Sequence, residues 1–321
     1  MDPSSYSQDF ELLTEIATAY YSDGITQEEI AQKFGFSRIK VGRLLKRARE
    51  EGIVEISVKY HPVFSSHLEK HLLERFPISR ALISLDYADE VEQRRQVSAL
   101  VSGYLSSNLR DNMIVAVGQG RNVAAVAEST TTTIQSRNCH FICGIGGTHR
   151  PGDVINADHI SRLLAKKFGG KSESLYAPAY VESPYLKQLF LQNGTIKETL
   201  DRARKADIAL VGIGDMNNDS YMVQLGWFTP QEINDASMNL GVIGDIAGFD
   251  FFDSQGQHVH TVMDDRVIGL SVEELRKIPC VIAIAAENSK AMAIIGALRT
   301  GAIDVIATSA RNVRTILGMA I

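Results

Sequence analysis

The sequence has few cysteines and lacks long apolar runs. The chain has three cysteines, Cys139, Cys143 and Cys280. An odd number of cysteines without paired spacing is typical of reduced thiols in a cytoplasmic protein. No stretch reaches the length of a membrane span, and no apolar N-terminal segment suggests export. His258 and His260 share a strand face, but a surface hairpin explains them without a metal. We therefore expect a cytoplasmic protein with no membrane segment, no metal site and no cofactor.

The chain also lacks an excess of positive charge, since its formal net charge at pH 7 is −5. Against this background, the segment from Lys33 to Arg49 contains seven Lys or Arg residues and no Asp or Glu. A cationic segment in an acidic protein is a local signal for phosphate binding. A solvated charged helix is the alternative explanation, because runs of charge are usually of that kind.

The residues around this segment predict where its helices begin and end. Thr26-Gln27-Glu28-Glu29 has the pattern of a capping box, in which a hydroxyl and a carboxylate each bond a backbone N–H group at the helix start. Gly35 permits the positive φ that ends this helix. Ser37 can cap a second helix over about 38–51, and Gly52 can stop it. Two helices joined by so tight a turn indicate a helix-turn-helix.

Further elements complete a DNA-binding domain over residues 1–60. A first helix over about 9–22 would pack beneath the other two, and residues 53–60 alternate like a strand that could form a wing. On the second helix of the motif, one face is apolar and the opposite face is cationic, as in helices that enter a major groove. Arg38, Lys40 and Arg43 are expected at base edges, and Lys46 and Arg47 on phosphates. The predicted DNA-binding residues are Thr26, Gln27, Ser37, Arg38, Lys40, Arg43, Lys46 and Arg47.

Residues 61–321 are long enough to form one large second domain, entered through an amphipathic helix near Leu68 to Phe76. Apolar runs alternate with helical segments through this region, a pattern that predicts a parallel sheet covered by helices on both faces. The strand-like runs are 81–85, 113–117, 140–143, 208–212, 280–285 and 304–307. The helical segments include 90–109, 158–168, 195–205, 271–277 and 289–300.

Glycine-bearing loops follow several of these strands, at the end where open α/β sheets bind ligands. Gly118-Gln119-Gly120, Gly144-Ile145-Gly146-Gly147-Thr148 and Gly212-Ile213-Gly214-Asp215 are three of them. Ala286-Glu287-Asn288-Ser289-Lys290 follows another strand and opens a helix. A lysine at a helix start opposes the helix dipole, which a bound phosphate would explain. Tight turns after strands also need glycine, so each loop alone is weak evidence.

Asp245 is a further candidate, because it stands between Gly244 and apolar residues. A carboxylate in such a place must find polar partners or be expensive to bury, and sugar hydroxyls could be those partners. A helix cap or a turn is the alternative role. The neighbouring Asp253 to Gly256 stretch reads as a simple hairpin turn.

Taken together, these motifs resemble bacterial sugar-responsive regulators of the SorC family over essentially the whole chain. The N-terminal match is Tyr20-Tyr21-x-x-Gly24-x-Thr26-Gln27-x-x-Ile30-Ala31 followed by Ser37-Arg38-x-x-Val41-x-Arg43-Leu44-Leu45-x-x-Ala48. The C-terminal match is Val211-Gly212-Ile213-Gly214, Gly244-Asp245-Ile246 and Glu287-Asn288-x-Lys290-x-x-Ala293-Ile294-x-Gly296-Ala297-Leu298.

The resemblance implies a homo-dimeric or homo-tetrameric transcription factor with a Rossmann-like, sugar-phosphate-isomerase-like effector domain. It also implies a phosphorylated sugar or polyol as effector, with Lys290 and the loop at Gly146 to Thr148 on the phosphate and Gln119 and Asp245 on the sugar. Gln119 departs from the family, in which this position is commonly aromatic. The predicted effector-binding residues are Gly118, Gln119, Gly120, Gly146, Gly147, Thr148, Asp245, Glu287 and Lys290.

Two functions are compatible with these features. The predicted one is a DNA-binding regulator of a carbohydrate or polyol catabolic operon, controlled by a phosphorylated effector. The alternative is an isomerase-type enzyme with an appended DNA-binding head, in which Asp245, Glu287 and Lys290 would supply acid–base groups. The sequence offers no compact set of residues committed to catalysis, and a shared fold alone does not transfer activity. We therefore predict a protein that is not an enzyme.

Overall fold

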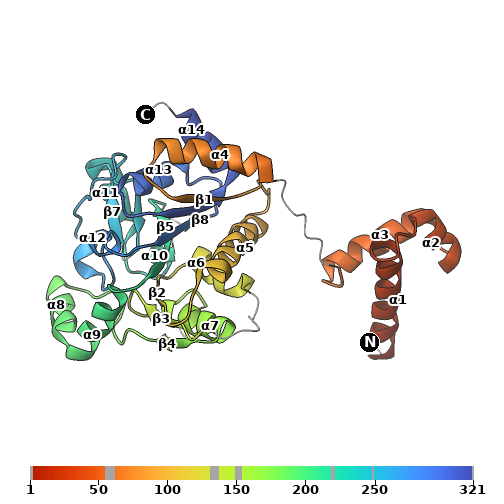
Figure 1. Ribbon diagram of the computed structural model, residues 1–321, viewed down its shortest axis with the longest axis horizontal. Coiled ribbons are helices and arrows are strands. Elements are labelled where there is room, and N and C mark those ends of the chain that lie inside the picture. Colours follow the sequence, from red (N-terminus) through yellow and green to blue (C-terminus); the bar gives the residue numbers. More distant parts are fainter. Residues whose placement is uncertain are drawn as a thin grey trace. The chain divides into compact units, whose positions relative to one another are not determined.

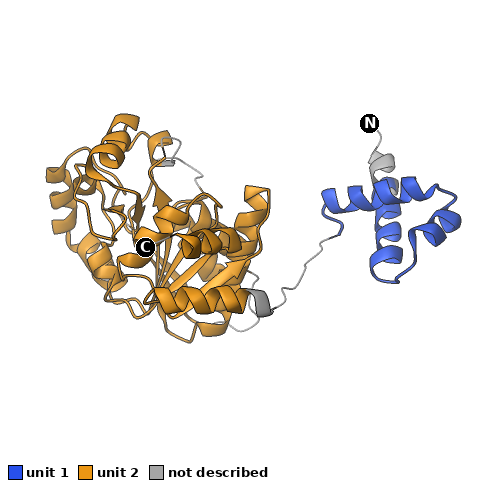
Figure 2. Ribbon diagram, turned by 90° about the horizontal axis from the view of Figure 1, so that it is seen from above, with its two compact units in different colours: residues 1–61 blue, residues 62–321 orange. Residues whose placement is uncertain are grey.

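A computed structural model of the chain describes residues 3–54, 62–130, 137–148, 154–217, 221–247 and 249–319. The chain divides into two compact units, residues 1–61 and residues 62–321 (Figure 2). No helix in the described part of the chain has both the length and the apolar character that a membrane span requires. All three cysteines are free thiols.

The first unit contains three helices, α1 (Pro3–Tyr21), α2 (Gln27–Phe34) and α3 (Arg38–Glu50) (Figure 1). The predicted capping box of α2 is confirmed: the Glu29 N–H donates to Thr26 Oγ1 over 3.3 Å, and the Thr26 N–H donates to Glu29 Oε2 over 2.9 Å. Gly35 ends α2 with a φ of 68°, and the Ser37 hydroxyl accepts from the Lys40 N–H. Local capping therefore fixes the short turn between α2 and α3.

A small core holds these helices together. Its fully or nearly fully buried side chains come from all three helices: Ile16, Ala19, Ile30, Ala31, Val41 and Leu45. Ile53 and Val54 pack beside Ala48 just after α3. The rest of the expected wing strand, residues 55–60, lies outside the described residues.

The second unit is built on a mainly parallel sheet, as the sequence predicts. Its strands are β1 (Arg80–Ser84), β2 (Ile114–Val117), β3 (His140–Cys143), β4 (Lys171–Glu173), β5 (Ile208–Asp215), β6 (Gly244–Ile246), β7 (Asp250–Phe252), β8 (Val281–Ala285) and β9 (Val305–Ser309). The order β1-β9-β8-β5-β2-β3-β4 is parallel throughout, and β6 and β7 form an antiparallel hairpin attached to the end of β5.

Helices connect the strands of this unit. They are α4 (Pro62–Arg75), α5 (Glu90–Asn108), α6 (Arg121–Ser129), α7 (Ala157–Phe168), α8 (Pro184–Gln192), α9 (Gly194–Ala203), α10 (Tyr221–Gln224), α11 (Pro230–Leu240), α12 (Val272–Leu275), α13 (Ala291–Arg299) and α14 (Ala310–Gly318), with a 3₁₀ turn η1 (Asp264–Arg266). The five helical segments expected from the sequence are present as α5, α7, α9, α12 and α13. Each differs from its expected bounds by at most three residues.

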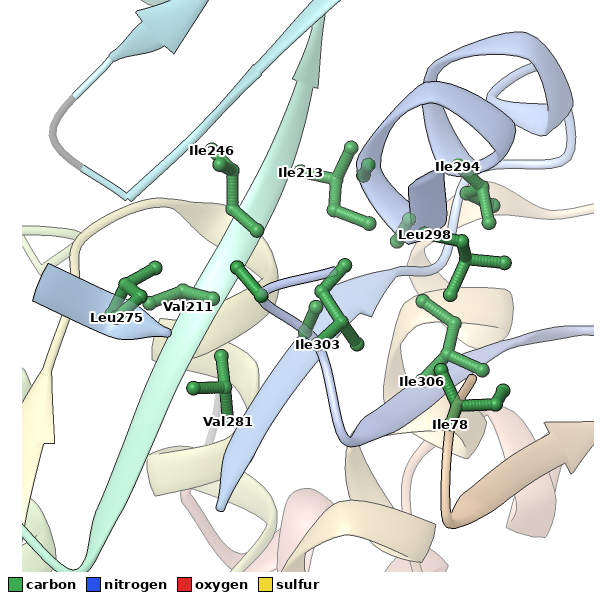
Figure 3. Close-up of a cluster of buried hydrophobic side chains, with 14 of the residues drawn as sticks. Ile78, Val211, Ile213, Ile246, Leu275, Val281, Ile294, Leu298, Ile303 and Ile306 are labelled. Atoms are coloured by element: carbon green, nitrogen blue, oxygen red, sulfur yellow. The ribbon is translucent and has the colours of Figure 1, made fainter. Parts of the chain in front are cut away.

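Alternate residues of the strands enter two different cores, because successive side chains of a strand point to opposite faces. On one face, strand side chains such as Ala116, Val211 and Ile306 pack with α4, α13 and α14. On the other face, side chains such as Val115, Leu210 and Ile282 pack with α5, α6 and α7. Figure 1 shows the two groups of helices on opposite sides of the sheet, and Figure 3 shows the first core around Ile306, Ile294 and Leu298.

The strand order places a topological switch point between β2 and β5. From β2 the chain adds β3 and β4 outward on one side, and from β5 it adds β8 and β9 on the other. Loops after adjacent strands therefore diverge at this point and leave a crevice at the carboxyl ends of β2, β5 and β8. A ligand site is expected in this crevice.

Leu298→Ala should lower the free energy of unfolding of the second unit by about 2–5 kcal/mol, because it leaves a cavity where a fully buried side chain packs. Met292→Ala in the same helix is the matched control. Met292 is 46% exposed, so its loss should cost about 0.5 kcal/mol or less. Urea denaturation measures both values. Equal losses would contradict the packing of α13 on the sheet.

Candidate functional site

The outer face of α3 carries exposed cations in the first unit. Arg38, Lys40, Arg43 and Lys46 are exposed, and each has a different environment. The Arg38 guanidinium lies 3.8 Å from the Glu28 carboxylate, and Lys46 forms an i,i+4 ion pair with Glu50 at 3.5 Å. The Lys40 ammonium lies 3.7 Å from the centre of the Phe36 ring. Surface pairs of this kind contribute little to stability, so these side chains can be released to a partner at small cost.

Arg47 differs from the other predicted phosphate contacts. Its guanidinium bonds Asp9 of α1 over 3.0 Å and Glu51 over 2.5 Å. The hydrogen bonds that Arg47 donates to Glu51 and Asp9 raise the pKa of Arg47. The side chain thus ties α3 to α1, which favours a structural role over a phosphate contact.

The remaining predicted DNA-binding residues lie at helix starts. The hydroxyl groups of Thr26 and Ser37 are occupied in capping α2 and α3, and Gln27 begins α2 beside Gly42 of α3. One residue of this surface was not predicted as a contact: Ile39 is 71% exposed between Arg38 and Lys40. Its position on the charged face of the helical wheel is the signal that could have identified it.

The second unit has a cavity of about 120 Å³ at the crevice between β2, β5 and β8. Five of the predicted effector residues line it: Gln119, Gly120, Asp245, Glu287 and Lys290. The other lining residues are Arg121, Asn122, Gly212, Ile213, Gly214, Asp215, Met222, Ala247 and Phe249. The loops after β2 and β8, the end of β5 and the β6–β7 hairpin thus meet at one place.

Glu287 is the most connected side chain of the cavity. Its carboxylate accepts from Asn122 Nδ2 over 2.9 Å and from Arg94 Nη2 over 3.3 Å, and it lies 3.4 Å from Lys290 Nζ. Its carbonyl oxygen accepts from Asn312 Nδ2 over 2.8 Å. Burial would raise the pKa of Glu287, but the Lys290 charge and the Asn122 hydrogen bond outweigh burial and lower this pKa to about 2. Glu287 is therefore ionised and fixed in place.

Lys290 lies beside Glu287 at the start of α13 and is also buried. Its ammonium donates to the Ile213 carbonyl oxygen over 2.8 Å, which links β5 to the loop after β8. An ammonium has three donors. The contacts to Ile213 and Glu287 leave one of them for a ligand.

Asp245 lies in strand β6, not at a helix cap or in a turn. Opposite it in the ladder is Gly214 of β5, where an added Cβ would stand 1.9 Å from Asp245 Oδ1. Only a glycine at position 214 leaves room for this carboxylate. Burial raises the pKa of Asp245 to about 7, against the lowering effect of the Lys290 charge.

Three residues that line this cavity each have a buried oxygen atom that accepts no hydrogen bond within the described residues. The atoms are Gln119 Oε1, Asn122 Oδ1 and Asp245 Oδ1. Buried polar atoms in folded proteins almost always have a hydrogen-bond partner. Three acceptors without one around a single cavity therefore indicate that a ligand with several hydroxyl groups, or ordered water, donates to them.

Two helices begin at the cavity without a capping side chain. Gly120 precedes α6 and Lys290 precedes α13, and neither makes a side-chain cap hydrogen bond. Every other α-helix whose N-cap residue is described has a Ser, Thr, Asp or Asn side chain in that role. The first N–H groups of an uncapped helix, together with its dipole, favour an anion.

Four predicted effector residues do not line the cavity. The Gly118 N–H donates to the Leu210 carbonyl group, the Gly146 N–H to that of Ile268, and the Gly147 N–H to that of Ala177. These N–H groups are engaged within the protein and do not offer themselves to an anion in this conformation. Thr148 Oγ1 accepts from Asn156 Nδ2 over 3.3 Å. An added Cβ at Gly146 would stand 2.4 Å from the Pro178 carbonyl group, so close packing explains this glycine.

Comparison with known proteins identifies the family. Residues 60–318 match a family described as "Putative sugar-binding domain". The sugar-binding domain of a transcriptional repressor from Vibrio fischeri is 56% identical, with a TM-score of 0.74, over 78% of this chain and 98% of that one. The full-length sorbitol operon regulator SorC from Klebsiella pneumoniae is 26% identical, with a TM-score of 0.72, over 97% of this chain and 99% of that one. The chain belongs to the SorC family of sugar-binding transcriptional regulators.

Another relative agrees with this placement. The transcriptional regulator LsrR of Escherichia coli K12 is 27% identical over 96% of this chain and 94% of its own length. SorC-family membership makes DNA and a sugar-type effector the partners of this chain. Because the relatives are named as regulators, the comparisons also favour the prediction of a protein that is not an enzyme.

In this SorC-family protein, some residues that line the cavity were not predicted from the sequence. Arg121, Asn122 and Asp215 follow glycines in loops that were recognised, but they were not predicted as site residues. Arg121 carries the same signal as Lys290, since it is a cation in the first turn of a helix. Met222 and Phe249 carry no comparable signal, because apolar residues of this kind fill cores throughout the chain.

Asp245→Asn should change how the stability of the second unit depends on pH. The folded-state pKa of Asp245 is raised to about 7, above an unfolded value of about 4. Its contribution to stability is therefore complete below about pH 4 and is lost as the pH rises to about 7. Urea denaturation between pH 4 and 8 should show the variant gaining stability relative to the wild type over this window. A difference independent of pH would contradict the buried, neutral carboxyl group.

Proposed function

We propose that the cavity binds a phosphorylated sugar or polyol, and that this effector controls binding of the first unit to operator DNA of a carbohydrate or polyol operon. The observation that carries the proposal is that residues around one cavity combine three buried oxygens that accept no hydrogen bond with two helix starts that have no capping side chain. The oxygens match hydroxyl donors, and the helix starts match an anion. A phosphorylated polyhydroxy compound has both.

The sugar end would lie against Gln119, Asn122 and Asp245. Each offers an unpaired buried oxygen, and a hydroxyl donor would satisfy it. Asp245 would accept from a sugar hydroxyl whether or not it is ionised, because a carboxyl group retains acceptor capacity when protonated. Gly214 supports this role by leaving the space that the Asp245 carboxylate occupies.

The phosphate end would lie against Arg121, Lys290 and the first turn of α6. Arg121 is exposed at the cavity rim, and it carries a guanidinium that suits bidentate binding of phosphate. Lys290 adds a buried positive charge close by. The roles implied by the resemblance for Gly118, Gly146, Gly147 and Thr148 stay predictions, and the engaged N–H groups favour Arg121 over them.

The DNA contacts would come from the exposed face of α3. Arg38, Lys40 and Arg43 stand in its N-terminal half, the part of a recognition helix that reaches base edges. Ile39 would contact an apolar group such as a thymine methyl, since it is exposed among these cations. Lys46 would contact a phosphate, and Arg47 would hold α3 in place. Assembly as a homo-dimer or homo-tetramer stays a prediction.

A thermal-shift screen tests the effector class, using sugar phosphates, polyol phosphates and their unphosphorylated counterparts. Arg121→Ala should weaken binding of the phosphorylated ligand by about tenfold or more, because at least one charge-assisted hydrogen bond is lost, and should leave binding of the unphosphorylated counterpart unaffected. Arg121 is a sharper probe than Lys290, whose removal would take away one of the two cations that pair with the buried Glu287 carboxylate.

The matched control is Arg95→Ala on α5, which removes an arginine 57% exposed that does not line the effector cavity. It should bind the ligand as the wild type does. If phosphorylated and unphosphorylated ligands stabilise the wild type equally, or if Arg121→Ala binds both as the wild type does, the phosphate assignment is wrong.

Lys46→Ala should weaken binding to specific and non-specific DNA alike and reduce the slope of log K against log salt by about one, because a phosphate contact releases a counterion. Lys70→Ala is the matched control: Lys70 is equally exposed and forms the same i,i+4 pair, with Glu74, on a helix of the second unit. Fluorescence anisotropy at several salt concentrations measures both. A change in sequence preference alone would refute the phosphate contact of Lys46.

A further inference from the structure

A second cluster of ligating side chains lies on the β6–β7 hairpin and the segment after it. It consists of Asp250, His258 and Asp264, and one ligand atom from each lies within 4.8 Å of the others. None of the three residues lines the effector cavity. Asp250 and His258 line a separate cavity of about 200 Å³. From the sequence alone no metal site is predicted, because the histidines show no ligand spacing and a surface hairpin explains His258 and His260.

The fold brings the three residues together. Asp250 begins β7, and the turn at Asp253 to Gly256 returns the chain so that His258 pairs with Phe252. Asp264 begins η1, six residues further along the chain. The three side chains therefore converge across the hairpin.

One buried oxygen atom of this cluster has no hydrogen-bond partner within the described residues. The Asp264 side chain is 10% exposed, and its Oδ2 accepts from the backbone N–H and the hydroxyl group of Thr261. Its Oδ1 is buried and accepts no hydrogen bond within the described residues. His258 Nε2 lies 3.7 Å from Oδ1. A metal ion bound by this oxygen and by the imidazole nitrogen would satisfy the buried oxygen.

The other carboxylate also accepts a backbone hydrogen bond. Asp250 accepts a hydrogen bond from the Val272 N–H group through Oδ2. Asp250 and Asp264 place two carboxylates within 4.8 Å of one another at the ligand atoms, and two negative charges held so close are costly without a nearby cation. His258 is about half exposed, which gives a cation a route from solvent.

We propose that Asp250, His258 and Asp264 bind one divalent transition-metal ion of the Zn²⁺ class. One imidazole and two carboxylates form a donor set that suits Zn²⁺, and three protein ligands leave a fourth position for water. Mg²⁺ and Ca²⁺ fit less well because they prefer oxygen ligands alone. The metal would fix the hairpin that holds Asp245, since Asp250 pairs with Ile246, the residue after Asp245.

His260 is close to the cluster but is not assigned as a ligand. Its Nδ1 lies 3.8 Å from Asp264 Oδ2, the oxygen already bonded by Thr261, and its Nε2 lies 3.4 Å from Asp265. It is 67% exposed, so its removal should leave the fold intact. His260 therefore provides a matched control for His258.

The test is titration of the full chain, freed of metal with a chelator, with Zn²⁺ in competition with a chromophoric chelator. The wild type and His260→Ala should bind one Zn²⁺ per chain at this site, and His258→Ala should bind it more than about tenfold more weakly. Equal Zn²⁺ binding by His258→Ala and the wild type would show adventitious binding at other histidines or thiols and overturn the proposal.

A thermal-shift measurement without sugar provides a second readout. Zn²⁺ should raise the melting temperature of the wild type and of His260→Ala, and should raise that of His258→Ala less. Mg²⁺ at the same concentration should have a smaller effect on the wild type. An equal effect of Mg²⁺ would overturn the assignment to the Zn²⁺ class. Because no effector is present, the outcome is independent of the proposed sugar-phosphate function.

Discussion

The buried ion pair between Glu287 and Lys290 is the constraint on which the effector cavity depends. It joins the loop after β8 to the end of β5 through Ile213, to α6 through Asn122, and to α5 through Arg94. A buried pair is stable only when its remaining donors and acceptors are satisfied, which ties these four elements into one arrangement. Two asparagines meet this need: Asn122 in the first turn of α6 donates to the Glu287 carboxylate, and Asn312 of α14 donates to the Glu287 carbonyl oxygen.

With the ion pair in place, the cavity keeps a set of polar groups that the protein does not satisfy. The unpaired oxygens belong to Gln119, Asn122 and Asp245, which line one cavity together with the N-cap residues of α6 and α13. Groups of this kind reduce stability in the absence of a ligand. A ligand that binds them gains affinity without first breaking internal bonds. The same logic applies to Asp264 in the second cluster, where the unpaired atom is a single carboxylate oxygen.

The parts of the fold that the sequence predicted share a physical cause. Apolar runs such as 208–212 and 280–285 predict buried parallel strands because both faces of such strands are covered, and the structure confirms them as β5 and β8. The capping box at Thr26 and Glu29 is an interaction between residues close in sequence, so it could be predicted from the sequence directly. The strands β4, β6 and β7 were missed because each has only three residues and no apolar run. In the cavity, Lys290 and Asp245 were found because each breaks a local rule, whereas Met222 and Phe249 break none.

The sequence by itself determined the two-part organisation, the helix-turn-helix and the identity of the loops that meet at the switch point, since these depend on local periodicity, capping and glycine. Tertiary structure alone decided which loop residues face the cavity. Gly146 and Gly147 turn their N–H groups to protein carbonyls, while Arg121 and Asn122 turn to the cavity. It also brought Asp250, His258 and Asp264 together. The reason is that hydrogen-bond partners distant in sequence are chosen by strand order and packing, which no local pattern records.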